Sequence, residues 1–149
     1  MTKKTPRLYF AYGSNLNLGQ MQMRCPLAKP LCVADLIGWR LVFKTHADVI
    51  PDPKARVTGA VYEITPACEW ALDRYEGFPN YYVKHEIKAS GGKQVMFYVM
   101  TDRRTLAMPS DGYLSCIHEG YRDWRLNARS LTNAVRWTER RTRQQVVSE

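Results

Sequence analysis

Two short segments of the sequence contain residue types that could do chemistry. The first directly follows an aromatic and apolar run at 7–12 and reads Tyr12-Gly13-Ser14-Asn15-Leu16. The run predicts a buried strand, and a tight turn after a strand exposes consecutive backbone N–H groups that can hold a carboxylate. An ordinary turn is the alternative, since these are common turn residues. The segment matches neither a phosphate-binding glycine loop nor a G-x-S-x-G nucleophile elbow.

The second segment places one acidic side chain among aromatic ones. Glu76 has four aromatic residues close to it in sequence, Tyr75, Phe78, Tyr81 and Tyr82. A carboxylic acid in apolar surroundings has a raised pKa. The alternative is an exposed side chain at a helix end, because Gly77 is a typical residue just after a helix.

Local patterns predict the elements that position these segments. A short helix is expected between Asn17 as N-cap and Pro26. A second helix is expected from Thr65-Pro66 to about Tyr75, which places Glu76 at its C-terminal edge. Strands are expected at 33–36 and 39–43, with a bulge or turn at Gly38, and at 57–64 after a loop at 51–53.

The later part of the chain predicts a hairpin followed by helices. Strands at 81–89 and 93–100 are joined through Ser90-Gly91-Gly92. Ser110 is expected to cap a helix through about Tyr121, and a last helix is expected at about 126–142, with a loose tail beyond Arg143. Hairpins with three or four helices indicate an α+β fold rather than a doubly wound parallel sheet, and a small barrel suits the strand count. The 149 residues suit one domain.

Composition narrows the function classes. The net charge is +8, and part of it lies at the two ends, which favours solvated, loose basic termini over a nucleic-acid surface. No run reaches the ~18 apolar residues that a membrane span needs, and no signal-peptide pattern is visible, so we expect a cytoplasmic protein without a membrane partner. The four cysteines and three histidines show no metal-binding spacing, so no metal is expected.

Taken together, the motifs resemble the γ-glutamylcyclotransferase-like superfamily. The resemblance rests on F-A-Y-G-S-N-L near the N-terminus, L-D-x-Y-E-G some 60 residues later and Pro109-Ser110-Asp111-Gly112-Tyr113, and it covers about residues 8–121. It implies an α+β fold around a small mixed, closed or nearly closed β-barrel. It also implies a pocket between the Tyr12–Leu16 loop and a catalytic acid that Glu76 matches.

The resemblance further implies a cofactor-independent reaction within glutathione-related metabolism. The α-amine of a γ-glutamyl group attacks its own γ-carbonyl, which gives 5-oxoproline and releases the attached amine or amino acid. Backbone donors of the Gly13–Leu16 turn are expected to stabilise the oxyanion. Tyr113 and Tyr82 match residues that contact substrate, and Tyr81 is the alternative to Tyr82 because a shift of one residue exchanges the faces of a strand.

Three readings stay open at this point. The leading one is a cyclotransferase, monomeric or homodimeric, whose small γ-glutamyl substrate is either an amino-acid or an amine derivative. The second is a catalytically silent module of the same fold that holds an anionic metabolite. The third is a nucleic-acid binder that acts through its basic ends, which predicts salt-dependent affinity.

Overall fold

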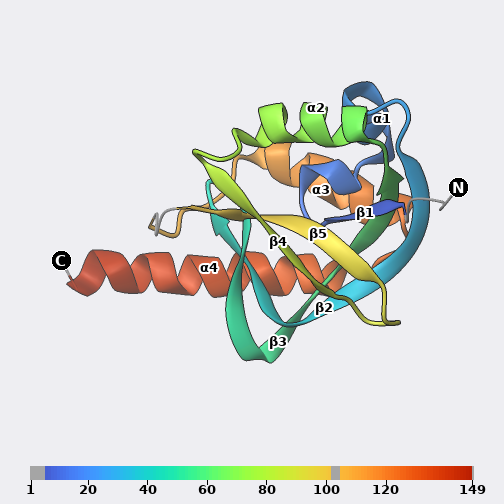
Figure 1. Ribbon diagram of the computed structural model, residues 1–149. Coiled ribbons are helices and arrows are strands. Elements are labelled where there is room, and N and C mark those ends of the chain that lie inside the picture. Colours follow the sequence, from blue (N-terminus) through green and yellow to red (C-terminus); the bar gives the residue numbers. More distant parts are fainter. Residues whose placement is uncertain (1–5, 102–104, 149) are drawn as a thin grey trace, which may run out of the picture.

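The computed structural model describes residues 6–101 and 105–148, and Figure 1 shows the arrangement of their elements. The strands are β1 (Arg7–Ala11), β2 (Lys29–Lys44), β3 (His46–Ile64), β4 (Tyr82–Lys88) and β5 (Gln94–Met100). The helices are α1 (Leu18–Arg24), α2 (Pro66–Glu76), α3 (Asp111–Asp123) and α4 (Ala128–Ser148), together with the 3-10 turn η1 (Ser14–Leu16). The basic N-terminal segment 1–5 lies outside the described residues.

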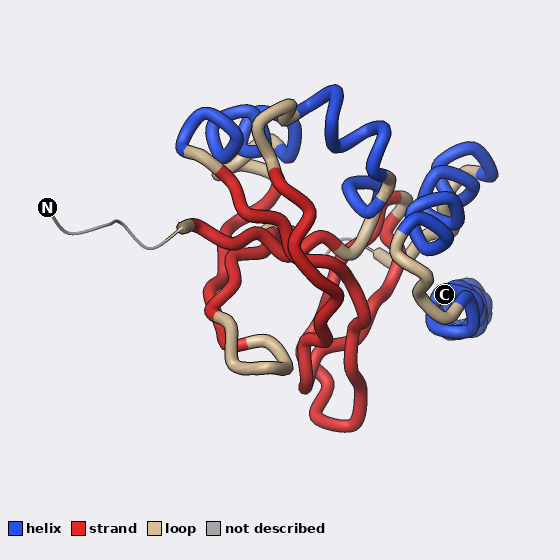
Figure 2. Tube along the Cα trace, turned by 90° about the vertical axis from the view of Figure 1, so that its right-hand side faces the viewer, coloured by secondary structure: helices blue, strands red, loops and turns tan. Residues whose placement is uncertain are grey.

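The strands form one mixed sheet in the order β2-β3-β1-β5-β4, in which β1 and β5 are parallel. The sheet curls so that its two edges approach each other (Figure 2). Near the gap, the Ser90 N–H donates to the Asp35 carbonyl at 2.9 Å, and the Ser90 hydroxyl accepts from the Asp35 N–H at 2.8 Å. The predicted α+β fold around a nearly closed barrel is therefore confirmed, with the strand ladder left open between β2 and β4.

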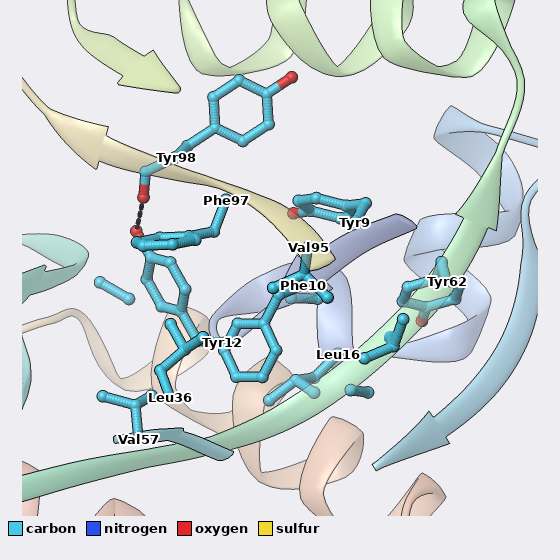
Figure 3. Close-up of a cluster of buried hydrophobic side chains, with 14 of the residues drawn as sticks. Tyr9, Phe10, Tyr12, Leu16, Leu36, Val57, Tyr62, Val95, Phe97 and Tyr98 are labelled. Atoms are coloured by element: carbon cyan, nitrogen blue, oxygen red, sulfur yellow. Dashed lines mark hydrogen bonds between the residues drawn. The ribbon is translucent and has the colours of Figure 1, made fainter. Parts of the chain in front are cut away.

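The inner face of the curled sheet holds the core that Figure 3 shows. Phe10, Leu36 and Phe97 are fully buried there, and Val57 is 2% exposed. Burial of each such side chain contributes roughly 1.5–3 kcal/mol to folding. Strands β1, β2, β3 and β5 thus share one apolar interior, and this interior fixes the ends of the strands from which the candidate site is built.

The helices begin where the sequence predicts them. The side chains of Asn17, Thr65 and Ser110 each accept a hydrogen bond from the backbone N–H three residues later, at 3.1 to 3.2 Å. At the other end of α2, Gly77 has a φ of 68°, in the left-handed region that glycine adopts without a steric penalty. Gly77 therefore ends the helix directly after Glu76.

Close packing of α3 fixes the position of η1. A Cβ added to Gly120 would lie 2.7 Å from the main-chain carbon of Leu16, so only glycine permits this approach. The Trp124 indole N–H donates to the Leu16 carbonyl at 2.9 Å. Helix α4 packs elsewhere, along β2, where the Phe43 N–H donates to the Thr138 hydroxyl at 3.1 Å.

Two expectations for the middle of the chain are wrong. The residues expected to form two strands form the single long strand β2, although the bulge expected as one alternative at Gly38 is confirmed: Gly38, with a φ of 87°, lies at a register shift within β2. The expected loop at 51–53 belongs to β3, because Pro51 pairs with Trp39 next to that shift. Proline is tolerated in strands at bulges, and the long β2–β3 ladder supplies partners that the local sequence does not reveal.

The C-terminal expectation also needs correction. Helix α4 continues to Ser148, whereas a loose tail was expected beyond Arg143. An ion pair between Arg143 and Glu139, four residues apart at 2.7 Å, lies on this last stretch, and such spacing supports a helix. No helix in the described ranges is long and apolar enough to span a membrane.

The cysteines are all free thiols. Cys25 and Cys68 are buried, and Cys32 and Cys116 are half-buried. Residues 6–101 and 105–148 contain no group of three or more histidine, cysteine or acidic side chains that could hold a metal ion.

Candidate active site

A cavity of about 240 Å³ lies where η1, the end of α2 and the start of α3 meet the sheet. Seven of the predicted site residues line it: Tyr12, Gly13, Ser14, Asn15, Glu76, Tyr82 and Tyr113. Five further residues complete the wall: Tyr9, His46, Ala47, Tyr75 and Tyr98. The fold thus brings together two segments that are about 60 residues apart in sequence.

Glu76 is the acidic side chain of this cavity. It is the last residue of α2 and is half-buried against aromatic walls. Burial raises the pKa of its carboxyl to about 7, and the positive charge of Arg24 opposes part of that rise. A carboxyl group with this pKa can accept and return a proton near neutral pH.

The glycine turn contributes Gly13, Ser14 and Asn15 to the cavity wall. The first hydrogen bond inside the turn runs from the Leu16 N–H to the Gly13 carbonyl at 3.0 Å, so the N–H groups of Ser14 and Asn15 have no partner within the turn. The Tyr62 hydroxyl stabilises the turn by donating a hydrogen bond to the Asn15 carbonyl at 2.8 Å. Because Gly13 has no side chain, it avoids crowding its neighbours at this point. An added Cβ would lie 3.1 Å from the Ala47 Cβ and 3.4 Å from the Tyr113 hydroxyl.

Ala47 holds two of the predicted substrate contacts. Its N–H donates to the Tyr113 hydroxyl oxygen at 3.0 Å, and its carbonyl accepts from the Tyr82 hydroxyl at 3.1 Å. Since Ala47 donates to Tyr113, the Tyr113 O–H hydrogen stays available for a ligand in the cavity. Burial raises the pKa of both phenols above the ordinary value for tyrosine, so both stay neutral.

The residue after Ala47 anchors this part of β3. Asp48 is 1% exposed, pairs with the Lys44 ammonium group at 2.8 Å and accepts a hydrogen bond from the Met100 N–H at 2.9 Å. Both charges of the pair are removed from water, and loss of one partner of such a pair is strongly destabilising. Asp48 therefore fixes the backbone that orients Tyr82 and Tyr113.

Tyr12 contributes its ring to the wall while its hydroxyl is used elsewhere. The hydroxyl donates to the Tyr98 carbonyl at 2.6 Å (Figure 3). The Tyr98 side chain in turn points toward α2, where its hydroxyl donates to the Asp73 carboxylate at 2.6 Å. Tyr12 and Tyr98 together therefore connect β1, β5 and the helix that carries Glu76.

Leu16 and Tyr81 are the two candidate residues that do not line this cavity. Leu16 is fully buried in the core, is absent from the cavity wall, and uses its N–H within the turn. Tyr81 is 60% exposed, whereas Tyr82 lines the cavity. Of these two alternatives, Tyr82 is the one that lines this cavity together with Glu76 and the glycine turn.

A second cavity of about 360 Å³ adjoins the first. The two share the wall formed by His46, Tyr75, Glu76 and Tyr82. The remaining wall of the second cavity consists of Arg74, Gly77, Tyr81 and Met100. Glu76 thus lines both cavities.

Sequence reasoning did not find several wall residues. His46 and Ala47 are the first two residues of β3, Tyr9 comes from the strand before the turn, and Tyr98 comes from β5. Tyr75 was noted only as a neighbour of Glu76. A strand pattern alone does not tell which end of a strand faces a pocket, but the alternation of Tyr9 with Phe10 could have placed Tyr9 on the face opposite Phe10.

Comparison with known proteins identifies the family. The sequence pattern of the family described as "Gamma-glutamyl cyclotransferase, AIG2-like" matches residues 9–125. The chain belongs to this family. Within it, the chain is 34% identical to a mouse protein named gamma-glutamylcyclotransferase and 33% identical to the human one, over 78% of this chain and 70% of each relative.

Solved structures agree with this membership. A structure named gamma-glutamyl cyclotransferase superimposes with a TM-score of 0.78 at 29% identity, covering 87% of this chain and 86% of the other. An uncharacterised human protein superimposes with a TM-score of 0.74 at 30% identity, covering 90% of this chain and 85% of the other. The family member described here therefore has the fold that the sequence resemblance implies, and its class is that of a cyclotransferase-type enzyme.

Proposed function

We propose that this family member converts a small γ-glutamyl amide into 5-oxoproline and a free amine or amino acid, with Glu76 as the general acid/base. The proposal rests on one observation above all: a carboxyl group whose pKa burial raises to about 7 lines the same cavity as a glycine turn. The family membership and the named relatives support the same reaction.

The reaction balances within one substrate molecule. The α-amine nitrogen attacks the γ-carbonyl carbon and forms the ring C–N bond, while the carbonyl π electrons move to oxygen. Glu76 takes a proton from the attacking nitrogen and gives it to the leaving nitrogen, and the original amide C–N bond breaks as the carbonyl re-forms. No electrons are exchanged with another reagent.

The pKa of Glu76 makes the first proton transfer feasible. A free α-amine has a pKa near ~8 and an ordinary glutamate near ~4.3, so transfer between them is uphill by roughly 5 kcal/mol. With Glu76 at about 7, the gap falls to about one unit, or roughly 1.4 kcal/mol. Attack makes the nitrogen more acidic and reduces the gap further.

The turn and the tyrosines supply the other groups that the reaction needs. We assign the Ser14 and Asn15 N–H groups to the developing oxyanion, a contribution worth roughly 3–4 kcal/mol at comparable sites. Tyr113, with an available O–H and a neutral phenol, would bind the α-carboxylate, and Tyr82 would close the pocket beside Glu76. The leaving group would occupy the second cavity, which Glu76 also lines.

Release of 5-oxoproline from a panel of γ-glutamyl amides tests this function. The panel should contain γ-glutamyl amino acids and γ-glutamyl amines, because both fit the chemistry of the two cavities. Turnover of at least one member, abolished in Glu76→Gln, is the expected result. Tight binding of 5-oxoproline or a panel member without turnover would instead favour a silent binding module, and neither binding nor turnover would refute the proposal.

A further inference from the structure

Arg24, the last residue of α1, joins the glycine turn to the end of α2. Its guanidinium group donates to the side-chain oxygen of Asn15 and, at 3.0 Å, to the Gln20 side-chain oxygen. Asn15 in turn donates to the Tyr9 hydroxyl at 3.0 Å. The arginine therefore fixes the orientation of a side chain in the proposed oxyanion turn.

The same guanidinium group stacks on Tyr75. Its central carbon lies 3.6 Å from the centroid of the tyrosine ring. The Tyr75 hydroxyl lies 3.3 Å from the Ser14 hydroxyl. Arg24, Tyr75, Ser14 and Asn15 thus form a closed set of contacts that spans from α1 through the turn to the residue before Glu76.

Arg24 also supplies charge to the site. The titratable and charged groups that line the two cavities beside Glu76 come from several elements: Tyr9 from β1, Tyr12 after it, His46 from β3, Arg74 and Tyr75 from α2, Tyr81 and Tyr82 at the start of β4, Tyr98 from β5 and Tyr113 from α3. Burial holds the pKa of Tyr9, Tyr12, Tyr82, Tyr98 and Tyr113 above the ordinary value, so these phenols are neutral. Burial favours the neutral acid at Glu76, and the positive charge of Arg24 acts in the opposite direction.

We propose that Arg24 is a positioning residue that holds the glycine turn against Tyr75 and keeps a positive charge beside the end of α2, where Glu76 lies. The proposal rests on the proposed role of Glu76 as acid/base. A planar guanidinium can position the turn and supply charge, because it stacks on a ring and donates through a rigid fork. A lysine would supply the charge alone.

Two variants separate the two tasks. Arg24→Gln removes the charge, so the titration midpoint of Glu76 should rise by roughly 0.5–1 pH unit, with a roughly 10- to 100-fold fall in kcat from the loosened turn. Arg24→Lys keeps a positive charge, so the midpoint should stay closer to that of the unaltered protein while kcat still falls. Arg40→Gln is the matched control, since Arg40 also stacks on an aromatic ring, that of Trp137, and pairs with Asp52 away from the cavity.

The decisive readout is a carboxyl NMR titration of the full chain without substrate. The Glu76 signal is identified by its loss in Glu76→Gln, and thermal unfolding shows whether each variant is folded. A higher midpoint in Arg24→Gln than in Arg24→Lys and Arg40→Gln supports the proposal. Equal midpoints in all folded variants would overturn it. If Arg24→Gln does not fold, a kcat for Arg24→Lys equal to that of Arg40→Gln overturns it instead. The titration needs no turnover, so it tests the role of Arg24 even if the protein releases no 5-oxoproline. Failure of the proposed function would be seen in the substrate panel instead.

Discussion

The Tyr12 hydroxyl donates a 2.6 Å hydrogen bond to the main-chain carbonyl of Tyr98, and this bond is buried. The donor is therefore used by the protein itself, although the Tyr12 ring lines the cavity. A tyrosine in the sequence motif could either shape the pocket with its ring or bind substrate through its hydroxyl. The hydrogen bond to Tyr98 assigns the first role to Tyr12.

Tyr12→Phe tests this assignment. The variant should lose roughly 1–3 kcal/mol of unfolding free energy, because a buried carbonyl loses its partner, while kcat/KM changes by only a few-fold. Urea unfolding and steady-state kinetics measure the two effects. A fall in kcat/KM of more than about 100-fold (roughly 2.7 kcal/mol) with unchanged stability would assign the hydroxyl to substrate.

The glycine turn should depend on its backbone more than on its serine. Gly13→Val places branched carbons where even a Cβ would lie 3.1 Å from Ala47 and 3.4 Å from the Tyr113 hydroxyl, so it should damage activity severely. Ser14→Ala removes only a 3.3 Å contact with the Tyr75 hydroxyl and should have the smaller effect. Kinetics of both variants, with circular dichroism as the folding control, give the order. The reverse order in folded variants would make the Ser14 hydroxyl the main contact.

Local sequence signals were sufficient where one residue type has one dominant structural use. Asn17, Thr65 and Ser110 cap their helices, and Gly77 ends α2, because these roles depend on a few neighbouring backbone groups. The position of Glu76 at a helix end follows from the same signals. Its opposition to the glycine turn does not, and it was inferred from family resemblance.

Local sequence signals were not sufficient where partners distant in sequence determine the structure of a segment or the role of a residue. Pro51 and Pro53 indicate a loop locally, yet both lie within β3, where Pro51 pairs with Trp39 of β2. The role of Ala47 is likewise invisible, because it acts through its backbone. Arg24 looks like any basic residue at a helix end until the fold brings it to Tyr75 and Asn15.

The pH dependence of activity should show two ionisations. Glu76 must be ionised to accept a proton, so activity should fall as the pH drops through about 7, the pKa that burial gives this group. The substrate amine must be neutral to attack, which adds an inflection near ~8. A γ-glutamyl analogue with a less basic amine should lower the upper inflection and leave the Glu76 titration of the free enzyme unchanged. If the pH of the upper inflection does not change with the basicity of the substrate amine, the result would contradict direct amine attack.

Glu76→Gln should move activity and stability in opposite directions. The folded-state pKa of Glu76, about 7, lies above the ordinary value of 4.5, so the stability associated with its neutral form is complete below pH 4.5 and is lost as the pH rises through 7. Glutamine does not ionise, so at pH 8 the variant should be more stable than the unaltered protein by up to about 3 kcal/mol, and at pH 4 the difference should vanish. Urea unfolding at the two pH values measures this. Glu139→Gln is the control outside the cavity, at a half-buried position of α4 where the carboxylate pairs with Arg143.

The most direct test is the rate of 5-oxoproline release by Glu76→Gln, measured with the best substrate of the γ-glutamyl panel. The amide has the size of the carboxylate but cannot accept the proton. The expected result is a fall in kcat of roughly 10²- to 10⁴-fold, with substrate still bound and Glu139→Gln unaffected. Near-normal release of 5-oxoproline by the folded Glu76→Gln variant would show that another group moves the proton.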